Sequence, residues 1–364
     1  MCAPFLKSSR FPSAILSTTV ITGNQEFLLA WQGYKKQKPM RFLLCRTDAI
    51  GDLVVTLPVQ SCILDKEPSA QVFWLVRPET APILDHFPGV SGVLHRLPDS
   101  DPEQLIKGVN PDVLLNIGHR DAEVIPAAKR AGVPVRVARP RGLRQIFYAT
   151  HIIWGSRSGS GRHESQNALD FLRPLGWPEC QPAVPRLVLT NGEAEQGEAD
   201  LQGIPRPRLG VILRGSGSGA YPSPRWWEMM LKASRVAGWH PVALSPPNQG
   251  ELPPTSLRGL MGRISACDAV IGPSTGPIHV AAAMNTPTLC LMGRRISHGP
   301  DRWAPLGDCV EVLQYPGEED DLGSGMDRLP AEDVLASLER FNIEKQQHQS
   351  DVCACRSVHP LAKP

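Results

Sequence analysis

The sequence predicts an α/β protein with two doubly wound parallel sheets in series, and three observations support this. Apolar runs of four or five residues alternate with helical stretches, as expected for strands buried on both faces of a parallel sheet. The alternation is interrupted once, over residues 176–207, and then resumes. The length of 364 residues also fits two domains, since a domain commonly has about 100–200 residues.

The first series covers residues 40–175, and we predict that it forms one Rossmann-like domain. Its clearest strand is Arg41–Cys45, and a helical stretch from Leu53 to Leu64 follows that strand. Further strands are expected at 72–76, 92–95 and 113–117. Ligands of such domains bind beside the carboxyl ends of the strands, so the residues that follow each strand are candidates for a site.

Residues 176–207 are rich in Pro, Glu and Gly, and we interpret them as an interdomain connection. Residues 208–341 then form the second series, which we predict to be a Rossmann-like domain with a C-terminal helix. Its strands are expected at 209–213, 241–244, 269–271 and 288–292. We interpret residues 1–39 as a poorly ordered extension and residues 342–364 as a polar tail. Two sheets in series imply a cleft between them.

Composition argues against several classes of function. The net charge is only +2, so no field of the whole molecule points to nucleic acid. No apolar run reaches the roughly 18 residues that a membrane-spanning helix needs. The nine cysteines form no CxxC pair and no zinc-site spacing, which is typical of a reducing cytoplasm. Four of them lie in apolar runs and are expected to be buried free thiols, namely Cys45, Cys62, Cys267 and Cys290.

The strongest candidate site reads Gly-Pro-Ser-Thr-Gly-Pro-Ile-His and ends at His279. A predicted strand enters a turn of small residues there, and Pro277 suits the first position of a helix. The free N–H groups and the dipole of such a helix favour an anion. Ser274, Thr275 and His279 can add donors to the same anion. An ordinary capped helix with a core histidine is the alternative interpretation.

A glycine-rich turn, Arg214-Gly-Ser-Gly-Ser-Gly-Ala220, follows the first strand of the second domain. Its backbone amides can approach a phosphate or a sugar, so Gly215 and Ser216 are donor-binding candidates. Gly215, Gly217 and Ala220 also match the dinucleotide pattern G-x-G-x-x-G/A, which makes an NAD(P)-dependent oxidoreductase an alternative. That pattern requires an acidic residue at the end of the next strand, and none stands there, so we regard the oxidoreductase as the weaker interpretation.

A candidate general base lies in Asp48-Ala-Ile-Gly-Asp52, the loop after the first strand. A carboxylate facing the cleft can take a proton from an acceptor hydroxyl, and Gly51 would let the loop lie close to a ligand. Asp52 is the first candidate and Asp48 the competing one. An N-capping aspartate that opens the following helix is the alternative for Asp52.

The segment between Glu123 and Glu164 is basic, because it contains a lysine and several arginines but no acidic residue. Either it is a solvated face, or it is a surface for an anionic acceptor or for membrane headgroups. Its acceptor-side candidates are Arg139, Arg141 and Arg144.

The D-x-D sequence Asp99-Ser-Asp101 could in principle hold a metal ion beside a diphosphate. It directly precedes Pro102 and a predicted helix, so we interpret it as a helix cap and expect no metal site.

Taken together, these motifs resemble glycosyltransferase family 9, the heptosyltransferases of lipopolysaccharide core synthesis. The resemblance covers about Met40 to Arg340 and rests on three elements in order. These are Gly51-Asp52-Leu-Val-Val-Thr56-Leu-Pro58, then His163-Glu164 with Leu175-Gly176, and then Ser274-Thr275-Gly276-Pro277-Ile278-His279 with Val280-Ala281-Ala282-Ala283.

The resemblance implies a GT-B fold, in which two Rossmann-like domains face each other across a cleft. It implies an acceptor site on the first domain and a nucleotide-sugar site on the second. Asp52 would be the catalytic base, and the donor phosphates would bind to Ser274, Thr275, Gly276, Pro277 and His279. The implied reaction is an inverting transfer of heptose from ADP-heptose, without a metal ion. Its implied acceptor is anionic and lipid-linked or a polysaccharide, such as the lipopolysaccharide core at the inner face of the membrane.

Two positions depart from the family pattern. The family often has Asp where this chain has Ser274, and it has a donor-contacting lysine where this chain has Pro224. Arg225 or Arg214 would then supply the positive charge. A family member that binds a nucleotide-sugar but has weak or no activity is therefore a further alternative.

Overall fold

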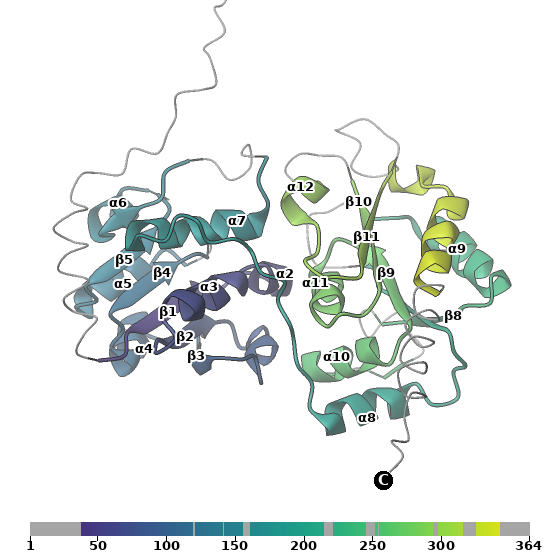
Figure 1. Ribbon diagram of the computed structural model, residues 1–364, viewed down its shortest axis with the longest axis horizontal. Helices are drawn as coiled ribbons and strands as arrows, with labels where there is room; N and C mark the ends of the chain where they lie inside the picture. Colours follow the sequence, from purple (N-terminus) through teal and green to yellow (C-terminus); the bar gives the residue numbers. More distant parts are fainter. Residues whose placement is uncertain are drawn as a thin grey trace, which may run out of the picture.

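The computed structural model describes residues 38–118, 121–140, 142–155, 161–214, 221–244, 252–253, 255–293, 298–315 and 325–342. It contains two lobes, and each is built on one parallel sheet with helices packed against it (Figure 1). The predicted α/β class with two parallel sheets is therefore confirmed. Among the described residues, no helix is long and apolar enough to cross a membrane.

The first sheet has six strands in the order β3-β2-β1-β4-β5-β6, and each neighbouring pair is parallel. Central strand β1 is buried on both faces, with Phe42 and Leu44 in one apolar cluster and Leu43 and Cys45 in another. This two-sided burial explains its unbroken apolar run. The strands are β1 (Arg41–Arg46), β2 (Gln71–Val76), β3 (Val90–His95), β4 (Val113–Asn116), β5 (Val135–Ala138) and β6 (His151–Ile152).

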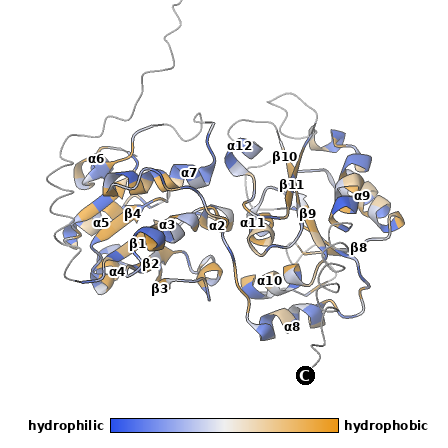
Figure 2. Ribbon diagram, viewed as in Figure 1, coloured by the Kyte–Doolittle hydropathy of each residue, from blue (hydrophilic) through white to orange (hydrophobic). Residues whose placement is uncertain are grey.

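Short helices connect these strands. They are α2 (Ile50–Val54), α3 (Pro58–Lys66), η1 (Ala81–Leu84), α4 (Pro102–Val109), α5 (Val124–Arg130), α6 (Leu143–Tyr148), α7 (Glu164–Leu169) and η2 (Asp170–Leu175). Figure 2 shows hydrophobic residues concentrated on the strands and hydrophilic ones on the outer sides of the helices.

The second sheet has five parallel strands in the order β11-β10-β9-β7-β8. They are β7 (Arg208–Val211), β8 (His240–Ala243), β9 (Ala269–Pro273), β10 (Thr288–Met292) and β11 (Val310–Gln314). The surrounding helices are α8 (Asn191–Asp200), α9 (Pro224–Val236), α10 (Leu257–Ser265), α11 (Gly276–Ala283), α12 (Pro300–Trp303) and η3 (Gly325–Arg328), and residues 331–342 are also helical.

Strands β5, β6 and β11 are not predicted by the sequence pattern. Strand β6 has only two residues, and β11 is a half-buried edge strand in which polar residues interrupt the apolar ones. Such strands lack the continuous apolar run that marks the centre of a parallel sheet.

Part of the stretch predicted to be an interdomain connection is helix α8. Thr190 caps this helix, and its hydroxyl accepts a hydrogen bond from the N–H of Glu193. Gly197 lies directly against the backbone of Gly262 in α10, and a side chain at Gly197 would collide with it. Helix α8 therefore packs closely on the second lobe through a pair of glycines.

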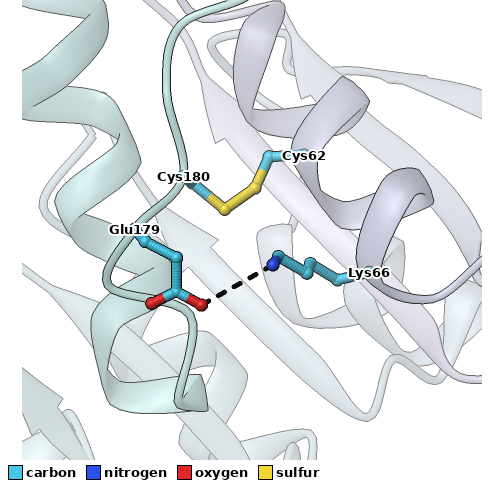
Figure 3. Close-up of a disulfide and its surroundings, with 4 residues drawn as sticks. All are labelled: Cys62, Lys66, Glu179 and Cys180. Atoms are coloured by element: carbon cyan, nitrogen blue, oxygen red, sulfur yellow. Dashed lines mark ion pairs between the residues drawn. A yellow bond between two sulfur atoms is a disulfide. The ribbon is translucent and has the colours of Figure 1, made fainter.

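The prediction that Cys62 is a free thiol is wrong. Cys62 of α3 forms a disulfide with Cys180, which lies 118 residues further along the chain (Figure 3). Beside it, Lys66 forms an ion pair with Glu179 at 3.6 Å. No local motif marks this pair, so it could not be predicted from the sequence. The cysteine pattern therefore no longer argues for a reducing compartment.

The other three apolar-run cysteines are free and buried, as predicted; they are Cys45, Cys267 and Cys290. Burial raises the pKa of the Cys267 thiol to about 12, so this thiol stays protonated and unreactive at neutral pH.

Candidate active site

The two lobes meet where helix α2 of the first lobe packs against helix α11 of the second (Figure 1). Two glycines allow this approach. A Cβ atom at Gly51 would lie 2.9 Å from Cδ2 of His279, and one at Gly276 would lie 2.9 Å from Cβ of Ile50. Both distances are too short for real contacts, so the crossing depends on the missing side chains. The two strongest sequence motifs are thereby brought together.

Asp52 occupies the third position of helix α2, and Ala49 is the residue that begins this helix as its N-cap. Asp52 is therefore not the N-cap residue, but it does cap the start of the helix, as the N3 member of a capping box. One carboxylate oxygen, Oδ2, accepts a hydrogen bond from the N–H of Ala49 at 3.3 Å. The other, Oδ1, accepts one from Nη2 of Arg46 at 2.5 Å. The carboxylate is thus held in a fixed orientation at the junction of the lobes.

Arg46 is the buried cation of the site, at the carboxyl end of β1, and its side chain is only 1% exposed. Its Nη1 donates to the carbonyl oxygen of Ile117 at 2.9 Å, and its Nε lies 3.4 Å from Oδ2 of Asp48. Sequence reasoning missed this residue. The available signal was an arginine at the end of an otherwise apolar strand, because a buried arginine requires charged partners.

Asp48 lies deeper than Asp52. The Asp48 side chain is 6% exposed and that of Asp52 is 24% exposed. A general base must reach the proton of its substrate, so this difference in exposure favours Asp52 over Asp48.

The donor-side candidates lie where β9 turns into helix α11. Thr275 is the N-cap residue, but its side chain makes no cap hydrogen bond, and Pro277 follows Gly276 in the first turn. Among the described residues, Oγ1 of Thr275 and Nδ1 of His279 are buried and have no hydrogen-bond partner. A simple capped helix would not leave these atoms without a partner, whereas a site for an anion or a sugar would satisfy them when occupied.

His279 is almost fully buried, and burial lowers the pKa of its imidazole to about 4. This value includes a smaller lowering by the neighbouring His163 and an opposing, raising effect of the Asp52 carboxylate. The imidazole is therefore neutral at pH 7 and can donate one hydrogen bond. Ser274 is already engaged, since its hydroxyl donates to the carbonyl oxygen of Trp303 at 3.3 Å.

A second connection between the lobes joins helix α7 to helix α12. Nε2 of His163 lies 2.8 Å from the carbonyl oxygen of Ala304, and Oε2 of Glu164 lies 3.3 Å from Nε of Arg302. Oε1 of Glu164 also lies 3.8 Å from Nη2 of Arg46. Sequence reasoning gave Glu164 no role and missed Arg302, because the contact joins residues 138 positions apart.

The remaining donor-side candidates do not join this cluster in the described residues. Arg214 and Arg225 are exposed, and Pro224 is the first residue of helix α9, which Ser223 caps. Gly215 and Ser216, with Gly217 and Ala220 of the dinucleotide pattern, lie outside the described residues.

The basic-segment arginines are engaged in other ion pairs. Arg139 pairs with Asp170 at 3.1 Å, and Arg144 pairs with Glu123 at 2.8 Å. Arg141 lies outside the described residues. The cap interpretation of the D-x-D sequence is confirmed for Asp101, whose carboxylate accepts from the N–H of Glu103 at 2.9 Å.

Comparison with known proteins finds similar sequences and similar folds. Residues 246–321 match the model of glycosyltransferase family 9 (heptosyltransferase). A Haemophilus influenzae relative with the name "Putative glycosyltransferase" is 22% identical, and the match covers 83% of this chain and 96% of that protein.

Two solved structures have the same fold. A family 9 glycosyl transferase from Veillonella parvula matches with a TM-score of 0.71 at 15% identity, over 84% of this chain and 98% of the other. The ADP-heptose lipopolysaccharide heptosyltransferase II of E. coli matches with a TM-score of 0.69 at 17% identity, over 84% of this chain and all of the other (100%).

The fold is the GT-B fold of these two solved structures, and the partial family match together with the relative supports an α/β glycosyltransferase. Within this class the chain resembles glycosyltransferase family 9, so the resemblance predicted from the motifs is confirmed.

Proposed function

We propose that this glycosyltransferase transfers a heptose from ADP-heptose to a hydroxyl group of an anionic acceptor, with inversion and without a metal ion. The observation that carries the proposal is the junction of the lobes. The carboxylate of Asp52 lies on one side. Oγ1 of Thr275 and Nδ1 of His279, which have no hydrogen-bond partner among the described residues, lie on the other, with Gly51 against the imidazole. The proposed base and the proposed donor site are therefore neighbours.

The donor diphosphate would bind at the N-terminus of helix α11. The free N–H groups of the first turn and the helix dipole favour an anion there. The hydroxyl of Thr275 and a neutral His279 would add hydrogen bonds. Fixed donors of this kind can stabilise the charge that develops on a leaving diphosphate, which is the task that a metal ion performs in other enzymes.

Asp52 would act as the general base. It would accept the proton of the acceptor hydroxyl while that oxygen attacks the anomeric carbon from the face opposite the diphosphate. The bond from the anomeric carbon to the diphosphate oxygen would break in the same step. Arg46 would hold the carboxylate in place through Oδ1, which leaves Oδ2, with its longer contact to Ala49, to meet the proton.

For the acceptor, we propose a lipid-linked saccharide or polysaccharide such as the lipopolysaccharide core, reached at the cytoplasmic face of the membrane. This proposal is supported by the name of the E. coli heptosyltransferase II and by exposed basic residues such as Arg144. A family member with weak or no activity stays the second candidate, because Pro224 replaces the lysine of the family pattern. The relatives named above give no support to an oxidoreductase.

The shift in melting temperature on adding nucleotides tests the donor, because a ligand that binds only the folded state raises it. We expect ADP and ADP-heptose to raise the melting temperature, and NAD to leave it unchanged. We also expect heptose transfer to continue in EDTA. Stabilisation by NAD but not by ADP would refute the proposed donor, and a loss of transfer in EDTA that Mg²⁺ restores would refute metal independence.

A further inference from the structure

We propose that Glu164 is a positioning residue that couples closure of the two lobes to the alignment of Asp52. Arg302 of the second lobe is its partner. This inference rests on the proposed function, in which Asp52 is the base. Glu164 itself would touch neither the sugar nor the acceptor, and would act through the two arginines on either side of it.

Four side chains form a continuous chain of charges across the junction. Arg302 contacts Oε2 of Glu164 at 3.3 Å, and Oε1 of Glu164 lies 3.8 Å from Nη2 of Arg46. The same Nη2 donates to Oδ1 of Asp52 at 2.5 Å. Of these four residues, only Arg302 belongs to the second lobe. The chain of charges therefore connects the second lobe to the proposed base on the first lobe.

Glu164 can affect Asp52 because both carboxylates compete for the same nitrogen of Arg46. Nη2 of Arg46 faces both the carboxylate of Glu164 and that of Asp52. Glu164 is 2% exposed, and a buried carboxylate requires charged partners. When Arg302 pairs with Oε2 of Glu164, Glu164 stays 3.8 Å from Nη2 of Arg46, and Asp52 keeps its 2.5 Å hydrogen bond to the same nitrogen. Without Arg302, Glu164 would draw the guanidinium of Arg46 away from Asp52.

The segment that carries Arg302 also touches the donor loop. The carbonyl oxygen of Trp303 accepts a hydrogen bond from Ser274, and that of Ala304 lies 2.8 Å from Nε2 of His163. Residues 302–304 thus contact the donor loop and helix α7 at the same time. Binding of the donor at this loop would therefore favour the position in which Arg302 reaches Glu164.

A double-mutant cycle tests the coupling, using ADP-heptose as donor. Glu164→Gln keeps the size of the side chain and removes its charge, and Arg302→Gln removes the partner. Arg302→Gln should lower kcat about tenfold, with KM for the donor within about twofold of its original value, and Glu164→Gln should lower kcat less, because it also removes the competitor of Asp52 for Nη2 of Arg46. The double variant should behave like Glu164→Gln, because without the charge of Glu164 nothing draws Arg46 away from Asp52. Arg302→Lys keeps the charge and should recover part of the loss.

Arg258→Gln is the matched control. Arg258 of helix α10 also reaches from the second lobe to the first, where it donates to the carbonyl oxygens of Pro82 and Asp85 at 3.4 Å each. It has no contact with the charge chain among the described residues. This variant should keep kcat unchanged.

A double variant slower than Arg302→Gln alone would overturn the proposal, as would a raised KM with unchanged kcat in Arg302→Gln. Small-angle X-ray scattering in the presence of ADP gives a second measurement that needs no turnover. Glu164→Gln and Arg302→Gln should increase the radius of gyration, and an unchanged radius would overturn the closure. If the unmodified protein transfers no heptose, the proposed function fails, and the scattering result alone decides whether the pair holds the lobes together.

Discussion

The charged residues at the junction are stabilised mainly by one another and little by solvent. Arg46 is buried at the end of a strand and is acceptable there only because Asp48, Asp52 and the carbonyl of Ile117 surround it. In turn, Asp52 owes its orientation to Arg46 and to the N–H of Ala49. Changes to one member should therefore affect the others, and stability and activity have to be measured separately.

Asp52→Asn should lower kcat by about 10²-fold or more, because the amide cannot accept the proton of the acceptor hydroxyl. The amide oxygen can still accept from Arg46, so we expect donor affinity to stay near its original value and the melting temperature to fall only slightly. Steady-state kinetics with thermal melts of the same samples give both quantities. Near-normal turnover with a large loss of stability would show a purely structural role, and Asp48→Asn would then be the next variant.

His279 should make the protein less stable in mild acid. Burial lowers the pKa of its imidazole from 6.5 to about 4, so the unfolded chain binds a proton on this residue between those values and the folded one does not. The free energy of unfolding should therefore fall as the pH drops from 6.5 towards 4, by at most about 3 kcal/mol from this group.

Urea unfolding of the unmodified protein and of His279→Gln at pH 7 and at pH 5 measures this contribution. The variant should lose less stability between the two values of pH. His95→Gln, at an exposed position of β3, is the control. Equal losses in the His279 variant and in the unmodified protein would contradict the assignment.

At the scale of elements, the site exists because helices α2 and α11 cross at two glycines. Neither helix is long, and neither carries the site alone. The first brings Asp52 from the end of β1, and the second brings Thr275 and His279 from the end of β9. The close crossing places Gly51, the residue before Asp52, directly against the imidazole of His279.

Gly51→Ala should separate these helices and lower kcat. The added methyl group would lie 2.9 Å from Cδ2 of His279, whose ring is buried and cannot move aside freely. Gly108→Ala in helix α4 is the control, because nothing lies within 4 Å of its Cβ position. That change should stabilise the protein slightly, by about 0.4–1 kcal/mol. Equal kinetics of the two variants would show that the crossing is not needed for turnover.

At the scale of the whole molecule, sequence patterns were sufficient for the two sheets and for the two motifs that meet between them. Buried central strands such as β1 and β10 appear in the sequence as unbroken apolar runs. The start of the helix that contains His279 is marked by neighbouring residues of one short motif. Contacts between distant segments leave no local pattern. For this reason the Glu164–Arg302 pair and the Cys62–Cys180 disulfide could not be predicted.

The disulfide should stabilise the folded protein, because it closes a long loop in the unfolded chain. We expect the double variant Cys62→Ser with Cys180→Ser to lose about 2–5 kcal/mol of unfolding free energy. Urea unfolding with and without a thiol reductant measures this. The reductant should affect the unmodified protein and leave the double variant unchanged. Equal stability of the two proteins without reductant would show that the bond contributes little.

The same disulfide also sets the length of the tether between the lobes. Cys180 is fixed to helix α3, and six residues later Arg186 is already anchored to the second lobe through Asn285 and Asp308. Only residues 181–185, Gln-Pro-Ala-Val-Pro, are left between the two anchors. With two prolines, a segment of this length reaches about 15 Å when extended. This connection therefore lets the lobes rotate relative to each other but limits how far they can separate. Reduction of the disulfide would lengthen the connecting segment.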